Sequence, residues 1–183
     1  MALKATIFKA SLDVANMDRG HYANRELTLA RHPSETDARM MVRLLAWCLN
    51  DSDSLEFTRG LSSTEEGDLC ERDATGGLTH WIELGEPDEK RIKQASRQSE
   101  QVTIYCYQSR SAAVWWRSIG DSLERYKSLA VVQIPDAAVA EMAALVERNM
   151  HLQCSIQEGD IWLSCDAGSV HIEPLILKAR ESG

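Results

Sequence analysis

Three acidic residues in the first half of the sequence could bind a hard cation. Glu35 stands at the start of an expected helix, whereas Asp68 and Glu83 stand on or beside expected strands. Mg²⁺ binds proteins through one or two carboxylates and keeps waters and substrate phosphate oxygens as its other ligands. Carboxylates brought together from neighbouring strands would therefore suit metal-assisted hydrolysis of a phosphodiester.

The surroundings of the two strand acids differ. Glu83 lies among Trp81, Ile82 and Leu84, which predict a strand enclosed on at least one face, where an ionised carboxylate is costly without a partner. The alternative is that Glu83 alternates outward to solvent. Asp68 belongs to a run of acids between residues 65 and 73, and this pattern alone favours a solvated loop acid.

Basic residues follow Glu83 on the next expected helix. Lys90, Lys93 and Arg97 recur at i, i+3 and i+7, so one helical face could hold phosphates or position a nucleophilic water. The alternative is a solvated face that balances the preceding acids. The histidines form no HxxxH or HExxH arrangement and no serine lies in a GxSxG elbow, so those hydrolase chemistries are unsupported.

Hydrophobic periodicity predicts the elements that would position these residues. Strands and helices alternate in the middle of the chain, which implies crossover connections and some parallel pairing. The predicted strands cover residues 5–14, 26–30, 55–61, 68–70, 79–84, 102–107, 129–134, 150–156, 160–164 and 169–173. The predicted helices cover residues 35–49 with Ser34 as cap, a helix from Pro87 and Asp88 to about residue 99, residues 112–125, and residues 136–148 with Asp136 as cap.

Composition limits the class of protein. With 183 residues and 44% hydrophobic content, we expect one domain with one substantial core. The net charge of −8 argues against a general nucleic-acid coat protein but leaves room for a local basic site. The apolar runs are too short for a membrane span, the N-terminus lacks a signal-peptide core, and the five cysteines form no CxxC pair, so we expect a soluble cytoplasmic protein.

Several ordered motifs resemble those of the YaeQ family of bacterial proteins across nearly the whole chain. The residues that carry the resemblance are 1–10 (MALKATIFKA), 27–35 (LTLARHPSE), 57–61 (FTRGL), 81–85 (WIELG), 87–89 (PDE), 91–93 (RIK) and 161–164 (IWLS). The family is described as a variant of the PD-(D/E)xK nuclease-like fold. The resemblance therefore implies an α/β domain with a mixed central sheet flanked by helices, an extra N-terminal hairpin and C-terminal antiparallel strands.

The resemblance also implies the site. Gly67 and Asp68 stand where the motif has Pro-Asp, and Glu83 begins the segment that matches (D/E)xK, so Asp68 and Glu83 would bind Mg²⁺ or Mn²⁺. Glu35 would be the acid from the preceding helix. Gly85 occupies the position of the motif lysine, which is expected to help orient or deprotonate the attacking water.

Relatives in the wider superfamily move a basic residue onto the following helix. This would make Lys90, Arg91 or Lys93 the substitute for the missing lysine. The resemblance thus leads to one hypothesis, a metal-dependent nuclease acting on nucleic acid. The other hypothesis is a catalytically degenerate scaffold that acts as a binding or regulatory module in nucleic-acid transactions such as transcription, and Gly85 and the net charge of −8 favour it.

Overall fold

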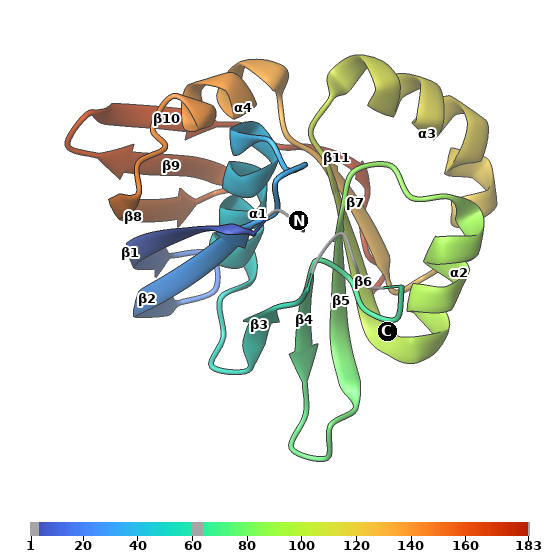
Figure 1. Ribbon diagram of the computed structural model, residues 1–183. Coiled ribbons are helices and arrows are strands. Elements are labelled where there is room, and N and C mark those ends of the chain that lie inside the picture. Colours follow the sequence, from blue (N-terminus) through green and yellow to red (C-terminus); the bar gives the residue numbers. More distant parts are fainter. Residues whose placement is uncertain (1–3, 60–63, 183) are drawn as a thin grey trace. The chain divides into compact units, whose positions relative to one another are not determined.

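The computed structural model describes residues 4–59 and 64–182 (Figure 1). Contacts divide these residues into two compact units. Unit 1 combines the chain up to Asp51 with Asp136–Pro174, and unit 2 combines Ser52–Pro135 with the segment from Leu175 onward. Each unit has its own mixed sheet. The N-terminal hairpin and the C-terminal antiparallel strands therefore form a separate sheet, which the sequence did not predict. The single domain stays a prediction.

Unit 1 contains a five-stranded sheet in the order β10-β9-β8-β1-β2. The predicted opening hairpin is confirmed, because β1 and β2 pair antiparallel along their whole length. β8 pairs parallel with β1, and β9 and β10 continue the sheet as antiparallel strands. The bounds are β1 Thr6–Asn16, β2 His21–Arg31, β8 Asn149–Gln157, β9 Asp160–Cys165 and β10 Gly168–Ile172.

The helices of unit 1 begin and end at other residues than predicted. Helix α1 spans Asp37–Asn50, and its cap is Thr36, whose hydroxyl accepts from the Arg39 backbone N–H at 3.1 Å. Ser34 is not the cap, because its hydroxyl bonds the His32 ring. Helix α4 spans Asp136–Ala143 and includes Asp136 in its first turn. It stops five residues early because i to i+3 bonds tighten the chain before β8.

Unit 2 contains a six-stranded sheet in the order β11-β7-β6-β5-β4-β3. The predicted parallel pairing is confirmed: β5, β6 and β7 are parallel neighbours joined by helices α2 and α3. β11 was missed by the sequence interpretation and closes one edge. The bounds are β3 Leu55–Phe57, β4 Leu69–Arg72, β5 Leu78–Leu84, α2 Glu89–Gln98, β6 Ser99–Cys106, α3 Ser109–Leu123, β7 Leu129–Gln133 and β11 Leu175–Lys178.

The strand predicted over residues 55–61 ends at Phe57, and residues 60 and 61 lie outside the described residues. The core of unit 2 forms where α2 and α3 cover the sheet. Trp81 on β5, Ile92 on α2 and Leu123 on α3 are almost fully buried in it. In the described part of the chain, no helix is long and apolar enough to span a membrane.

Candidate functional site

Asp68 is a buried residue at the entrance to β4, with 4% of its surface exposed. Its backbone N–H donates to the Ile82 carbonyl at 2.7 Å, and its Oδ2 accepts from the Leu84 backbone N–H at 2.8 Å. Both partners lie on β5, so this acid is fixed by the neighbouring strand. Local composition favours a solvated loop acid at Asp68, and this interpretation is wrong because the residue is buried.

Glu83 lies on β5 beside Asp68. The antiparallel register pairs Leu69 with Ile82, which places Asp68 next to Glu83 one residue further along. Glu83 keeps only 15% of its side chain exposed, so the alternative that it points freely to solvent is wrong. Trp81 Nε1, two residues away on the same strand, donates to its Oε2 at 2.7 Å.

The ionisation of Glu83 reflects these neighbours. Burial raises the pKa of the Glu83 carboxyl, and the negative charge of Asp68 raises it further. The hydrogen bond from Trp81 and the charge of Arg91 lower the same pKa, but burial prevails. A cation beside Asp68 and Glu83 would favour the ionised form of Glu83.

Arg91 is the basic residue that the structure brings to this carboxylate. Its guanidinium lies 3.4 Å from Glu83 Oε2 and its centre lies 4.8 Å from the centre of the Trp81 ring. It also donates to the Thr64 carbonyl, and at 2.6 Å to the Glu66 carbonyl. Helix α2 begins two residues earlier, capped by Asp88, whose side chain accepts from the Arg91 backbone N–H at 2.8 Å.

Lys90 and Lys93, the other two candidates on this helix, are exposed. The helix buries Ile92 and Ala95 against the sheet. Arg91 lies four residues before Ala95, at the edge of this buried face, and its side chain therefore reaches Glu83 on β5. The face formed by Lys90, Lys93 and Arg97 is exposed.

Glu35 belongs to unit 1. Its Oε2 lies 2.6 Å from Arg39 Nη1 and its Oε1 lies 2.7 Å from Arg43 Nη2, and both carboxylate oxygens are buried with their partners. The i,i+4 line of Glu35, Arg39 and Arg43 in the sequence is thus a buried ion-pair cluster. A role for Glu35 as a third acid beside Asp68 and Glu83 stays a prediction.

Two glycines mark the departures from the nuclease motif. Gly85 has φ +100°, a backbone conformation that L side chains rarely adopt, and its N–H donates to the Tyr105 carbonyl at 2.9 Å. Gly67 packs so closely that an added Cβ would lie 2.7 Å from Trp81 Cδ1. Backbone conformation therefore accounts for the glycine at position 85, and close packing accounts for the glycine at position 67.

The arrangement places groups suited to a hard cation next to a group suited to an anion. Asp68 and Glu83 offer oxygen ligands of the type that Mg²⁺ and Mn²⁺ take. Arg91 offers a planar fork of donors that matches phosphate geometry. The local pattern made Glu83 a candidate, and only the family resemblance made Asp68 one. Trp81 as a donor to Glu83 was missed, because an indole in an apolar strand is more often a core residue.

Comparison with known proteins gives consistent matches over almost the whole chain. A family model described as "YaeQ protein" matches residues 1–174. A relative from Escherichia coli K12, named "Uncharacterized protein YaeQ", is 45% identical over 172 residues, covering 94% of this chain and 95% of the relative. A relative of the same name from Salmonella typhi is 44% identical over 173 residues, covering 94% of this chain and 96% of the relative.

Solved structures give the same result. The crystal structure of YaeQ protein from Xanthomonas axonopodis pv. citri is similar with a TM-score of 0.92 and 42% identity, covering 98% of this chain and 99% of that chain. The crystal structure of YaeQ protein from Pseudomonas syringae is similar with a TM-score of 0.91 and 32% identity, covering 96% of this chain and 97% of that chain. The mixed α/β fold with two sheets is thus shared with these proteins.

Proposed function

This chain belongs to the YaeQ family, and we propose that it is a metal-dependent nuclease of the PD-(D/E)xK type. In this proposal, Asp68 and Glu83 hold one Mg²⁺ or Mn²⁺ ion and nucleic acid is the substrate. The observation that carries the proposal is the adjacency of the buried Asp68 and the largely buried Glu83 across β4 and β5, where burial and then the charge of Asp68 raise the pKa of Glu83. A divalent cation would relieve this repulsion.

The proposal gives each residue a separate task. Asp68 is positioned by the Leu84 N–H, so its carboxylate has a fixed direction. Glu83 is positioned by Trp81 and Arg91. The bound ion would activate water and stabilise charge that develops on the phosphoryl oxygens.

Arg91 takes the place of the motif lysine in part only. Its guanidinium is always protonated, so it can bind the scissile phosphate but cannot accept a proton from water. To bind phosphate it must exchange its contacts with Glu83 and with the carbonyls of Thr64 and Glu66. Lys90 and Lys93 are exposed on the same helix and would add positive charge for a polyanion. The proposed location of the protein is the cytoplasm.

Calorimetric titration with Mn²⁺ and with Mg²⁺ tests the metal site. We expect one binding event in the wild-type protein that is absent from the Asp68→Asn/Glu83→Gln double variant. Glu65→Gln is the matched control, because Glu65 is an exposed acid in the segment just before Asp68. Equal heats in wild-type protein and double variant would refute the metal site.

A second candidate function is favoured by two observations, the φ of +100° at Gly85 and the engagement of Arg91 by Glu83 and two backbone carbonyls. In this candidate, a scaffold without the motif lysine acts as a binding or regulatory module in nucleic-acid transactions. Nuclease assays on single- and double-stranded DNA and RNA with Mg²⁺ and Mn²⁺ separate the two candidates. Turnover that disappears in Glu83→Gln supports the nuclease, and retained nucleic-acid binding without turnover supports the module.

A further inference from the structure

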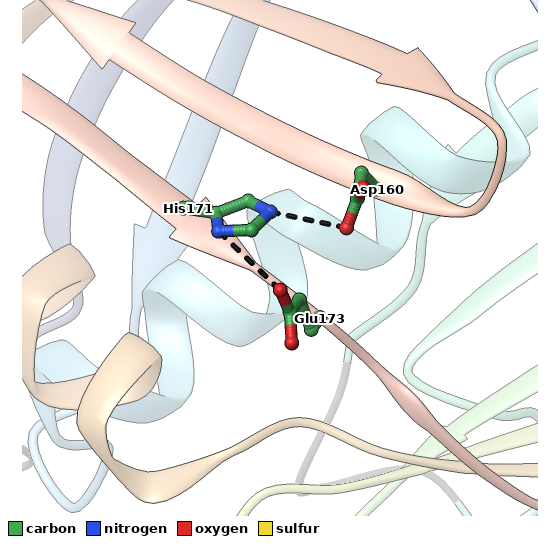
Figure 2. Close-up of side chains that lie close together, drawn as sticks. All are labelled: Asp160, His171 and Glu173. Carbon is green, nitrogen blue, oxygen red and sulfur yellow. Dashed lines mark hydrogen bonds and ion pairs between the residues drawn. The ribbon is translucent and has the colours of Figure 1, made fainter.

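A second group of metal-binding side chains lies within unit 1 alone, on the last hairpin of its sheet. Asp160 is the first residue of β9, His171 lies on β10, and Glu173 follows β10 (Figure 2). One ligand atom from each residue lies within 4.8 Å of the other two. Sequence inspection missed this group because Asp160 and His171 are eleven residues apart and match no short metal-binding motif.

The two imidazole nitrogens of His171 each face a carboxylate. Nε2 lies 3.0 Å from Asp160 Oδ1, and Nδ1 lies 3.7 Å from Glu173 Oε1. A neutral imidazole carries one N–H, so one nitrogen would direct its lone pair at a carboxylate oxygen. A metal ion between that nitrogen and its carboxylate would bind to both.

The ring is also held in orientation. Trp162 on β9 is the register partner of His171 on β10, and the two rings stack with centres 4.3 Å apart and planes 13° apart. Stacking fixes the plane of the imidazole, while the hydrogen-bond distance to Asp160 fixes which nitrogen points to which acid. Asp160 thus bonds Nε2, while Nδ1 faces Glu173. This is the arrangement found where a carboxylate orients a metal-binding histidine.

We propose that His171 Nδ1 and Glu173 bind one divalent transition-metal ion of the Zn²⁺ or Co²⁺ type, with Asp160 accepting the Nε2–H. Two ligands about 2.0–2.1 Å from a tetrahedral zinc lie roughly 3.3 Å apart. The observed 3.7 Å between Nδ1 and Oε1 is close to this, and the exposed side chain of Glu173 can rotate to close the difference. The 3.0 Å contact to Asp160 is instead a hydrogen-bond length.

The ligand set selects the class of metal. An imidazole nitrogen favours zinc, cobalt, nickel and copper over magnesium and calcium, whose ligands are oxygens. The site is exposed, so water would complete the coordination. It differs in this respect from Asp68 and Glu83, which supply oxygen alone and to which we assign Mg²⁺ or Mn²⁺.

Titration with Co²⁺ and with Zn²⁺ tests this site, using calorimetry and the visible absorption of bound Co²⁺. The background variant carries Asp68→Asn and Glu83→Gln, which remove the proposed Mg²⁺ or Mn²⁺ site. It also carries Cys165→Ser, which removes a partly exposed thiol that could bind zinc. We expect His171→Ala to abolish the binding event and Glu173→Gln to weaken it at least tenfold. Asp160→Ala should weaken it by about tenfold to a hundredfold through loss of the orienting carboxylate.

His151→Ala is the matched control, because His151 is an exposed histidine on β8 of the same sheet. Binding that survives in His171→Ala overturns the proposal. A second measurement follows the ring nitrogens of His171 by NMR. If the ring takes up a proton but its resonances do not respond to Zn²⁺ in the wild-type protein, no metal site exists. Circular dichroism verifies that each variant is folded.

Discussion

Asp68 Oδ2 accepts a hydrogen bond from the backbone N–H of Leu84 at 2.8 Å, across the boundary between β4 and β5. This bond allows stability and metal binding to be separated. Asp68→Ala leaves a buried N–H without its acceptor and should lower the free energy of unfolding by about 1–3 kcal/mol. Asp68→Asn keeps an acceptor oxygen and should cost less than Asp68→Ala, while both variants lose Mn²⁺ binding.

Denaturant unfolding with chelator present and Mn²⁺ calorimetry measure the two effects. Glu65→Gln is the control for charge removal, because Glu65 is an exposed acid in the segment just before Asp68. Mn²⁺ binding that persists in Asp68→Asn would contradict the assignment of Asp68 as a ligand.

Glu83→Gln should weaken Mn²⁺ binding without lowering the free energy of unfolding, unlike Asp68→Ala. The pKa of Glu83 is raised by burial and by Asp68, so the folded protein disfavours the ionised form. The stabilising contribution of such a group is complete below its unfolded pKa and is lost as pH rises through its folded pKa. At neutral pH in chelator, we therefore expect Glu83→Gln to unfold no more easily than the wild-type protein, while its Mn²⁺ affinity falls at least tenfold.

The pH dependence of denaturant midpoints checks this expectation. The advantage of Glu83→Gln should be largest at neutral pH and should disappear in acid, where Glu83 is protonated. A variant that is clearly less stable at neutral pH would show that the bonds from Trp81 and Arg91 outweigh burial.

Arg91 ties the segment before β4 to helix α2. Its guanidinium reaches the carbonyls of Thr64 and Glu66 together with Glu83, a set that the single ammonium of lysine cannot span. Arg91→Lys should therefore lower the free energy of unfolding of unit 2 by about 2 kcal/mol, within the range of hydrogen bonds to charged groups. Hydrogen exchange of the Asp68 N–H, which donates to Ile82, should become faster.

Lys93→Ala is the matched control on the same helix, and as a surface change it should stay within about 0.5 kcal/mol of the wild-type protein. Equal exchange at Asp68 in both variants would show that Arg91 does not hold the segment.

The sequence predicts the frame of unit 2 better than its site. β5, β6 and β7 are short apolar runs that alternate with helices, so their strands and some parallel pairing could be inferred. Burial of Asp68 depends on pairing with β5, which no local pattern encodes. Arg91 reaches Glu83, and Lys90 and Lys93 do not, because of which face α2 buries. The apolar residues Ile92 and Ala95 could have indicated that face.

In unit 1 the predictable part was the hairpin of β1 and β2, because alternation and a turn signal lie within one stretch of chain. The parallel pairing of β8 with β1 joins residues about 140 positions apart, so the separate sheet could not be read from local patterns. The register that places His171 beside Trp162 is likewise a tertiary fact.

Asp51 should govern the acid stability of unit 1. Its fully buried carboxylate takes three hydrogen bonds from Arg25, one from Trp47 and a contact of 2.7 Å from His21. Burial alone would raise its pKa, but the bonds from these three residues outweigh burial and lower it. A lowered folded pKa gives stability that is present above the unfolded pKa and is lost as pH falls through the folded pKa.

Asp51→Asn should therefore destabilise the protein at neutral pH and have a shrinking effect in acid. We expect a loss of about 3 kcal/mol, the low end for a broken buried pair, because Arg25 keeps 22% of its side chain exposed. Urea unfolding from neutral pH down to pH 3 provides the measurement, with Asp53→Asn as a neighbouring control. A constant difference at all pH values would mean that ionisation of Asp51 is not its source.

Gly85 offers a direct test of whether the missing lysine limits catalysis. Nothing lies within 4 Å of the position a Cβ would take, so a lysine has space, but φ of +100° strains any L side chain. Gly85→Lys and Gly85→Ala should both lose about 1–3 kcal/mol of stability through the same backbone cost. A comparison of the two variants therefore measures the effect of the lysine amine on catalysis separately from the backbone cost.

We expect Gly85→Lys to cleave nucleic acid faster than Gly85→Ala in Mn²⁺, because an amine beside Glu83 can assist deprotonation of the attacking water. The increase should require Asp68, so Asp68→Asn in the Gly85→Lys background should remove it. Equal rates in both glycine variants would indicate that the scaffold lacks more than one lysine, in line with a binding or regulatory role. Unfolding midpoints of Gly85→Ala equal to the wild-type value would contradict the strain assigned to this position.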